Sequence, residues 1–286
     1  MNASCSHLYN IMNTLYISDL DGTLLQPNAK LSPSTIQTIN ELMQKGMNFT
    51  CATARTYAST NKLLEPLNIR LPLVLMNGAC VYNKGLNRYE KIEYLDKDTI
   101  KVILDFLKET NMTGFLYEIK DNTLCTYYED LDSKGRKDFH DERVNLFQKR
   151  FVKVEDFSEL DPTHILYFCL IDTEEKTKEL YELLSDEPSL KLERYTDIYS
   201  KDLWYLEIFS VNASKYNAVQ YLRKQYEFDQ IIGFGDNLND LALFKACEEC
   251  YAVANAKEDV KKAATKVIDY NYNDGVANFL KNHYTS

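Results

Sequence analysis

The sequence lacks the features that would point to a membrane or to nucleic acid. It has no run of about 18 or more apolar residues, so no transmembrane helix is expected. Basic residues are fewer than acidic residues: the chain has 33 lysines and arginines and 43 aspartates and glutamates, for a net charge of −10. Such a surface repels phosphate backbones and anionic lipids, which excludes nucleic acid and membranes as expected large-surface partners. A small phosphorylated ligand is compatible with this charge if a local cation inverts the sign in one cleft. Nothing in the sequence indicates a protein partner.

Histidine and cysteine show no pattern typical of a zinc site or a disulfide framework. The 4 histidines lack metal-ligand spacing. The 7 cysteines are odd in number and scattered, which is typical of reduced thiols and predicts a cytoplasmic location. Cys247 and Cys250 match C-x-x-C, but no second pair or redox context accompanies them. We therefore interpret them as core and helix-end residues.

Residues 1–13 also lack the basic start and long apolar stretch of a secretory signal. We interpret them as a loose extension, with Met12 as a candidate natural start. The 286 residues, 45% of them hydrophobic, suffice for a sizeable core in one large domain or two smaller ones.

Strand and helix patterns alternate at both ends of the chain. The N-terminal part predicts strands over 14–18, 48–52 and 73–76, with a helix after Ser32-Pro33 and another over 57–64. From Ser214 the alternation returns, with expected helices over 215–225, 257–264 and 274–282 and strands over 231–234 and 249–253. This alternation of strands and helices predicts an α/β fold whose core is a Rossmann-like, doubly wound parallel sheet.

The middle of the chain has a different pattern, in which helices are mixed with neighbouring strands. It predicts helices over 96–109, 142–147 and 174–184, and strands over 114–119, 124–128, 165–171, 190–195 and 205–208. We therefore expect an α+β domain inserted into the α/β core.

Acidic residues follow two of the predicted core strands. Asp19-Leu20-Asp21-Gly22-Thr23 ends the first strand, and Asp236 and Asp240 follow the strand over 231–234. Ligands of open α/β sheets bind at these carboxyl ends of the strands. Converging carboxylates repel one another unless a hard divalent cation lies between them, and oxygen-only ligands favour Mg²⁺.

The same groups suit phosphoryl transfer. One carboxylate can attack phosphorus, and its neighbour can donate and later accept a proton. The hydroxyl of Thr53 and the ammonium of Lys215 could hold and neutralise a phosphate.

Four motifs, in this order, resemble those of the haloacid dehalogenase-like hydrolases: Asp19-Leu20-Asp21-Gly22-Thr23, Thr53, Lys215, and the stretch Gly235-Asp236-Asn237-Leu238-Asn239-Asp240. The insert and the form of the last motif resemble the Cof-like branch, which has a large α/β (type IIB) cap and mostly hydrolyses phosphorylated sugars and related metabolites. The resemblance covers nearly the whole chain from about Thr14. It implies a discontinuous catalytic core over 1–83 and 209–286, and a cap over 84–208 that determines substrate specificity.

The resemblance also implies the catalytic roles. Asp19 is similar to the nucleophile and Mg²⁺ ligand of the family. Asp21 resembles its general acid/base, whose backbone carbonyl also binds the metal. Asp236 resembles the third metal ligand, and Lys215 the lysine that stabilises the nucleophile and the phosphate.

Further residues resemble the phosphate-binding set. Thr53, Ala54 and Asn239, together with Lys215, correspond to phosphate contacts, and Asp240 to a carboxylate that orients Lys215 or a metal-bound water. Two positions depart from the branch: Ala54 replaces a glycine that tolerates positive φ, and Tyr216 replaces a glycine after the lysine.

These observations predict a Mg²⁺-dependent phosphatase that acts on small phosphorylated metabolites through an aspartyl-phosphate. Two alternatives stay open at this point. One is a phosphomutase or phosphotransferase on the same scaffold, and the other is a non-catalytic metabolite-binding module.

Overall fold

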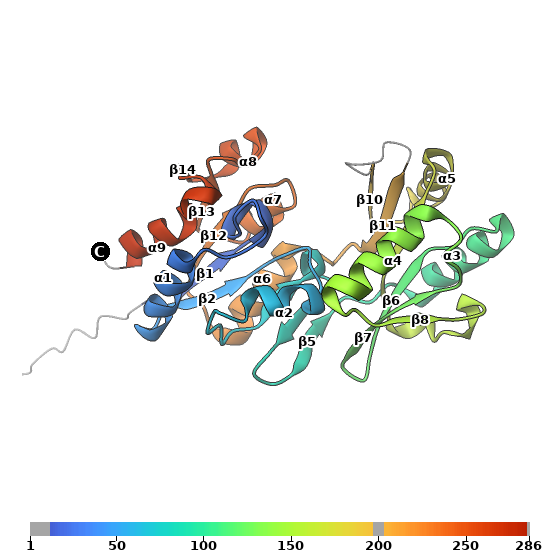
Figure 1. Ribbon diagram of the computed structural model, residues 1–286, viewed down its shortest axis with the longest axis horizontal. Helices are drawn as coiled ribbons and strands as arrows, with labels where there is room; N and C mark the ends of the chain where they lie inside the picture. Colours follow the sequence, from blue (N-terminus) through green and yellow to red (C-terminus); the bar gives the residue numbers. More distant parts are fainter. Residues whose placement is uncertain (1–11, 197–202, 285–286) are drawn as a thin grey trace, which may run out of the picture. The chain divides into compact units, whose positions relative to one another are not determined.

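The computed structural model describes residues 12–196 and 203–284, which divide into two compact units (Figure 1). The first unit contains residues up to 51, residues 67–71 and residues from 219 onward; the second contains 52–66 and 72–218. The extension expected over 1–13 lies almost wholly outside the described residues. In this grouping by contacts, residues 52–66, 72–83 and 209–218 join the insert. The domain boundaries at 83/84 and 208/209 remain a prediction.

The first unit is built on a five-stranded sheet with the order β14-β13-β12-β1-β2, in which every neighbouring pair is parallel. Its strands are β1 (Thr14–Ser18), β2 (Asn48–Cys51), β12 (Gln230–Gly235), β13 (Glu249–Val253) and β14 (Lys266–Ile268). Leu15 and Ile17 of β1 are fully buried. β1 pairs with β12 on one side and β2 on the other, as its continuous apolar sequence favours. The predicted parallel core is confirmed.

Four helices pack around this sheet: α1 (Pro33–Gln44), α7 (Asp240–Phe244), α8 (Glu258–Ala263) and α9 (Gly275–Tyr284). α1 begins where the Ser32-Pro33 pair predicts, because Ser32 Oγ accepts a hydrogen bond from the Thr35 N–H at 2.9 Å. α6 (Lys215–Tyr226) starts in the second unit and ends in the first.

The second unit contains a six-stranded sheet with the order β10-β11-β9-β6-β7-β8. Its strands are β6 (Phe115–Lys120), β7 (Thr123–Tyr128), β8 (Phe151–Lys153), β9 (Ile165–Asp172), β10 (Leu190–Thr196) and β11 (Trp204–Ser210). α3 (Lys97–Thr110) and α5 (Glu174–Leu184) lie on one face, and α4 (Lys134–Phe147) lies on the other (Figure 1). The predicted α+β insert is therefore confirmed.

The two faces of this sheet differ in chemistry because side chains alternate along each strand. On the face of α3 and α5, Leu206 and Ile208 join a buried apolar cluster with both helices. The alternate residues of β11, including Glu207, point to the face of α4. There Phe139 of α4 stacks on Phe115 with ring centroids 4.8 Å apart.

Two sequence predictions were wrong in detail. The strand over 73–76 was expected in the parallel sheet, but β3 (Leu73–Leu75) pairs antiparallel with β4 (Cys80–Asn83). β3 keeps only a single parallel bridge, between Val74 and Ala52. The cause is the turn at Asn77 and Gly78, whose φ angles of +54° and +95° reverse the chain. β5 (Arg88–Ile92) completes this three-stranded sheet, and α2 (Tyr57–Leu64) precedes it.

α4 was predicted to begin near Glu142, yet it begins at Lys134. Ser133 caps it, since its Oγ accepts from the Arg136 N–H at 3.2 Å. Across the described residues, none of the helices combines the length and hydropathy needed to cross a bilayer. The six cysteines of the described ranges form no disulfide, and burial raises the pKa of the Cys247 thiol.

Candidate active site

The end of β1 is followed by a tight turn that fixes Asp19. The Asp19 N–H donates to the Phe234 carbonyl of β12 at 2.9 Å, and the Leu25 N–H closes the turn on the Leu20 carbonyl at 2.9 Å. Gly22 has φ +80°, and a Cβ there would collide with the carboxylate of Asp236. Glycine is therefore required where this turn approaches the neighbouring strand.

The loop after β12 is held by its own carboxylates. Asp240 Oδ2 accepts hydrogen bonds from the N–H groups of Asp236 at 2.9 Å and of Asn237 at 3.0 Å. The Thr23 hydroxyl donates to Asp236 Oδ1 at 2.7 Å and so joins this loop to the turn after β1. These bonds hold Asp236 in one orientation.

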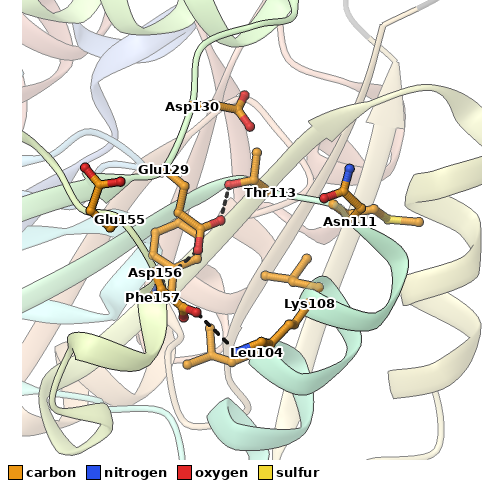
Figure 2. Close-up of a pocket in the computed structure, with 11 residues that line it drawn as sticks. Leu104, Lys108, Asn111, Thr113, Glu129, Asp130, Glu155, Asp156 and Phe157 are labelled. Carbon is orange, nitrogen blue, oxygen red and sulfur yellow. Dashed lines mark hydrogen bonds and ion pairs between the residues drawn. The ribbon is translucent and has the colours of Figure 1, made fainter.

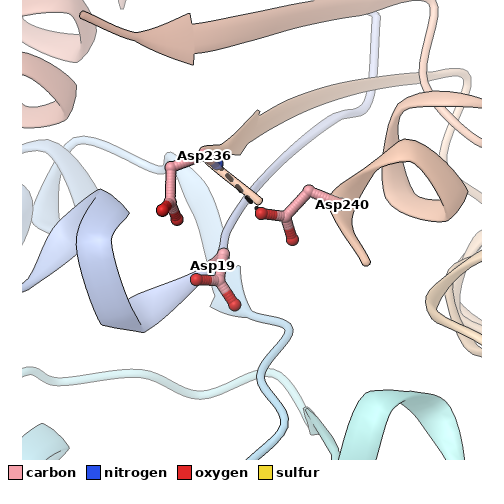
Figure 3. A group of neighbouring side chains, drawn as sticks. All are labelled: Asp19, Asp236 and Asp240. Atoms are coloured by element: carbon pink, nitrogen blue, oxygen red, sulfur yellow. Dashed lines mark hydrogen bonds between the residues drawn. The ribbon is translucent and has the colours of Figure 1, made fainter. Parts of the chain in front are cut away.

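Three carboxylates meet at these strand ends. Oxygen atoms of Asp19, Asp236 and Asp240 all lie within 4.8 Å of one another (Figure 3). Asp19 and Asp240 are buried. Buried carboxylates at this spacing repel strongly unless a cation compensates them. The donor set consists of oxygen alone, which fits Mg²⁺ better than zinc.

Asp21 behaves differently from Asp19. Its side chain is exposed and does not belong to the group of three carboxylates. An exposed carboxyl group exchanges protons readily with water, which is compatible with acid/base chemistry. Its predicted metal contact was through the backbone carbonyl, and that role stays a prediction.

The predicted phosphate-binding residues of the second unit are held by one turn. Thr53 is 1% exposed; its N–H donates to the Val74 carbonyl at 2.9 Å, and its own carbonyl accepts from the Asn77 N–H at 3.0 Å. The hydroxyl of Thr53 accepts from the Arg55 N–H at 3.2 Å. The backbone of residues 53–55 is therefore fixed against the turn that follows β3.

Lys215 is the first residue of α6 and is 1% exposed. Ser214 caps this helix by accepting from the Asn217 N–H at 3.1 Å. Gly78, on the turn that also holds Thr53, packs so closely on the Ser214 and Lys215 backbone that a Cβ would overlap it. The turn at Asn77 and Gly78 therefore positions both Thr53 and the start of α6.

The two departures from the family pattern are accommodated. Ala54 is exposed and does not adopt a positive φ, so a glycine is not needed there. Tyr216 is 40% exposed on α6, so its ring faces solvent. Asn239 directly precedes α7 and is half-buried, and its phosphate contact stays a prediction.

Two asparagines that sequence reasoning missed support the turn after β1. Asn255 Nδ2 donates to the Gly22 carbonyl at 2.7 Å, and Asn271 Nδ2 donates to the Leu25 carbonyl at 2.8 Å. Asn255 in turn accepts from the Asn271 N–H at 3.0 Å. The only sequence signal was a pair of amides after the strand over 249–253.

A separate pocket of about 230 Å³ lies in the second unit, beside α3 (Figure 2). Two of its acidic groups, Glu129 and Asp156, are engaged with the protein itself. Glu129 accepts from the Thr113 hydroxyl at 2.8 Å and from the Phe157 N–H at 2.9 Å, and Lys108 pairs with Asp156 at 3.2 Å. We assign this pocket a structural role.

Comparison with known proteins identifies the family. The sequence profile described as haloacid dehalogenase-like hydrolase matches residues 16–280. The chain belongs to this family. The predicted resemblance to the haloacid dehalogenase-like hydrolases is confirmed.

Similar proteins of this family are named as phosphatases. The chain is 26% identical over 278 residues to the 5-amino-6-(5-phospho-D-ribitylamino)uracil phosphatase YitU of Bacillus subtilis, covering 93% of this chain and 96% of that protein. It is 23% identical over 282 residues to the pyridoxal phosphate phosphatase YbhA of Escherichia coli, covering 93% and 96%.

Solved structures agree with the fold. TM0651 of Thermotoga maritima has a TM-score of 0.80 at 28% identity and covers 95% of this chain and 97% of its own. The subclass IIB sugar phosphatase BT4131 has a TM-score of 0.68 at 20% identity and covers 94% and 98%. The latter likeness concerns the fold alone.

Proposed function

We propose that this hydrolase is a Mg²⁺-dependent phosphatase that releases phosphate from small phosphorylated metabolites through an aspartyl-phosphate. The observation that carries the proposal is the convergence of Asp19, Asp236 and Asp240 at the ends of adjacent parallel strands, within 4.8 Å. The scattered cysteines favour a cytoplasmic location.

The residues present fit a bound magnesium ion. Asp19, Asp236 and the backbone carbonyl of Asp21 would hold it, and Asp240 keeps the Asp236 loop in place. When bound, Mg²⁺ would neutralise charge on the carboxylates and on the phosphate.

The chemistry runs in two displacements. In the first, an oxygen of Asp19 forms a bond to phosphorus while the bond from phosphorus to the leaving oxygen breaks, and protonated Asp21 gives that oxygen its proton. In the second, water attacks phosphorus, Asp21 takes a proton from it, and the bond to Asp19 breaks. Thr53, Ala54, Asn239 and Lys215 would bind the phosphoryl oxygens, with Lys215 supplying positive charge.

The two departures from the branch do not favour the non-catalytic alternative, because Ala54 adopts no positive φ and Tyr216 is exposed. A phosphomutase would use the same aspartyl-phosphate but would return the group to a sugar hydroxyl. Product analysis in the assay below distinguishes the two outcomes, since hydrolysis yields free phosphate and a mutase yields an isomeric ester.

The decisive experiment is phosphate release by the Asp19→Asn variant, measured with a panel of sugar phosphates, pyridoxal phosphate, nucleotides and flavin mononucleotide. We expect turnover to fall by about 10³-fold or more, because the amide is not a nucleophile. EDTA should abolish the activity of the unaltered protein. Asp105→Asn, at an exposed position on α3, is the matched control and should leave turnover unchanged. Normal turnover by Asp19→Asn would falsify the proposal.

A further inference from the structure

The turn that carries Asp21 has an irregular backbone beside its exposed carboxyl group. Asp21 has φ −74° and ψ 120°, and Gly22 follows with φ +80°, so the turn over Leu20–Leu24 is not helical at these two positions. A glycine adds conformational freedom to such a segment. The position of the Asp21 side chain therefore depends on hydrogen bonds that reach the turn from other parts of the chain.

Asn255 makes such a bond and uses both ends of its amide. Its Nδ2 donates to the Gly22 carbonyl at 2.7 Å, and its Oδ1 accepts from the Asn271 N–H at 3.0 Å. Because one end of the amide meets an acceptor and the other end meets a donor, only one orientation of the amide satisfies both groups. Asn255 therefore fixes the carbonyl of the residue that follows Asp21.

The loop that carries Asn255 is itself anchored beside the carboxylates. The Ala256 N–H closes a turn on the Val253 carbonyl of β13 at 2.9 Å, and the Lys257 N–H donates to the Asp236 carbonyl at 2.9 Å. All of these residues belong to the first unit, as does the turn after β1. Asn255 therefore connects that turn to a loop whose own position is determined by the site.

Burial separates the roles of the two asparagines that support the turn. Asn271 is 6% exposed and its Nδ2 donates to the buried Leu25 carbonyl, so its loss would leave a buried carbonyl without a donor. Asn255 is exposed, and water can replace its bond to Gly22 at little cost to folding. Water would not hold the turn in one position, however. A contribution to stability is therefore a poor account of Asn255.

The metal-binding carboxylates predicted for this site are held by other bonds. The Asp19 N–H donates to β12, and Asp236 accepts from the Thr23 hydroxyl. Neither bond involves the Asn255 side chain. Loss of that side chain should therefore displace Asp21 more than it displaces Asp19 or Asp236.

We propose that Asn255 is a positioning residue for Asp21. By holding the Gly22 carbonyl, it keeps the Asp21 carboxyl group where its proton can pass to the leaving oxygen as the bond from phosphorus to that oxygen breaks. The inference rests on the proposed phosphatase function and adds a residue that affects the reaction through Asp21. It assigns Asn255 no contact with the phosphoryl group.

The test compares two esters that differ in their need for a proton. The para-nitrobenzyl and para-nitrophenyl phosphates carry the same substituted ring, but the benzyl alkoxide leaves poorly without a proton, whereas the nitrophenolate needs none. At saturating Mg²⁺, Asn255→Ala should lower kcat/KM for the benzyl ester by about 10- to 100-fold and that for the phenyl ester by less than about threefold. Asp21→Asn should show the same selectivity with a larger loss.

Asn278→Ala is the matched control, because Asn278 is also exposed and its Nδ2 donates to a backbone carbonyl outside this turn, that of Asn273, at 2.8 Å. It should change kcat/KM for neither ester. Asn255→Asp keeps the acceptor for the Asn271 N–H and removes the donor to Gly22. It should therefore show the same selective loss, and it replaces Asn255→Ala if thermal unfolding shows that the alanine variant does not fold.

Equal losses for the two esters in the folded Asn255 variant, or no loss for either, would overturn the inference. A lack of selectivity in Asp21→Asn would contradict the proposed role of Asp21 and, with it, this inference. Phosphate release from the phenyl ester by Asp19→Asn at the normal rate would instead contradict the proposed function. The three results are distinguishable because each concerns a different variant.

Discussion

Gly22 shows how a single residue without a side chain can determine the geometry of a carboxylate cluster. Its φ is +80°, and the carboxylate of Asp236 occupies the space that a Cβ would take. In Gly22→Ala we expect Asp236 to move away from Asp19, which should weaken Mg²⁺ binding by about 10-fold or more and cost about 1 kcal/mol or more of stability. A titration of activity against Mg²⁺ and a thermal unfolding curve measure the two effects.

Gly46→Ala is the control for backbone strain. Gly46 also has a positive φ, +101°, but its nearest neighbour would be the Tyr284 hydroxyl at an ordinary 3.6 Å. This variant should lose stability and retain its Mg²⁺ affinity. Equal Mg²⁺ affinities in the two glycine variants would contradict the steric argument.

At the scale of single residues, the sequence predicted the acidic residues of the site well. It predicted poorly the residues that hold these acidic residues in place. Asp19 and Asp236 could be predicted because carboxylates at strand ends are costly without a function. Asn255 and Asn271 could not, because a neutral amide in a loop has no distinctive pattern and gains its role only from the carbonyls it contacts. Asp240 accepts from the N–H groups of residues 236 and 237, which the sequence did not predict, and its expected role in orienting Lys215 or a metal-bound water stays a prediction.

At the scale of elements, the turn between β3 and β4 connects two predicted phosphate-binding groups. Gly78 contacts the backbone of Ser214 and Lys215, and Asn77 bonds to Thr53. In Gly78→Ala we expect Lys215 to be displaced, which should lower kcat/KM by about 10-fold or more. Mg²⁺ affinity should stay normal, because the three carboxylates belong to the other unit.

Steady-state kinetics at several Mg²⁺ concentrations separate these effects. Gly46→Ala again controls for the positive φ. A Gly78→Ala variant with unchanged kcat/KM would show that the position of α6 does not depend on this turn.

Lys149, two residues after the end of α4, has a charge that is unfavourable in the folded state. Burial, followed by the charges of Arg143 and Arg55, lowers the pKa of Lys149 from 10.5 to about 7. Between pH 7 and 10.5 the unfolded chain binds more protons at this site, so the stability contributed by Lys149 rises with pH across that window. Below pH 7 the full penalty applies.

Lys149→Met should therefore raise the free energy of unfolding at pH 6, by about 1 kcal/mol or more after allowance for partial exposure. At pH 9.5 the gain should be much smaller. Urea unfolding at both pH values measures the difference, and Lys153→Met, at an exposed position on β8, serves as control. The same gain at both pH values would refute the assigned pKa shift.

Elements with strong periodicity could be predicted, and those decided by local geometry could not. The inner strands β1 and β12 of the parallel sheet contain continuous apolar runs, as burial on both faces requires, whereas the edge strand β14 is largely exposed and was not predicted. β3 is equally apolar, but its partner is decided by positive φ angles at Asn77 and Gly78, which periodicity does not encode. The start of α4 depends on the Ser133 cap in a stretch with few apolar residues.

At the scale of the whole molecule, the net charge of −10 and the buried carboxylates lead us to expect that the proposed Mg²⁺ stabilises the folded state. Binding to the folded state alone adds about 2.7 kcal/mol of stability at a concentration 100 times Kd. We expect Mg²⁺ to raise the Tm and EDTA to lower it. Differential scanning calorimetry across a Mg²⁺ series measures the shift.

Asp236→Asn should largely remove that shift, since it deletes one of the three carboxylates. Asp156→Asn, in the pocket beside α3, should keep it. A shift of the same size in both variants would mean that Mg²⁺ stabilises the protein through its overall charge.

The sequence also predicted that the two ends of the chain share one sheet, because the alternation of strands and helices in the first 76 residues returns after Ser214. It did not reveal how residues 52–66 and 72–83 divide between the units. That division depends on contacts made by the Asn77-Gly78 turn and the antiparallel strands after it, and these follow from backbone angles at single residues.

The hydrogen bond from Thr23 to Asp236 spans 213 residues of chain. A ribosome that adds about 5–20 residues per second needs about 10–40 s to make that stretch. During this interval β1 emerges without β12, the strand that later lies beside it. The growing chain is therefore inactive until its last quarter is translated. Any premature stop codon before residue 236 should yield a product without enzymatic activity.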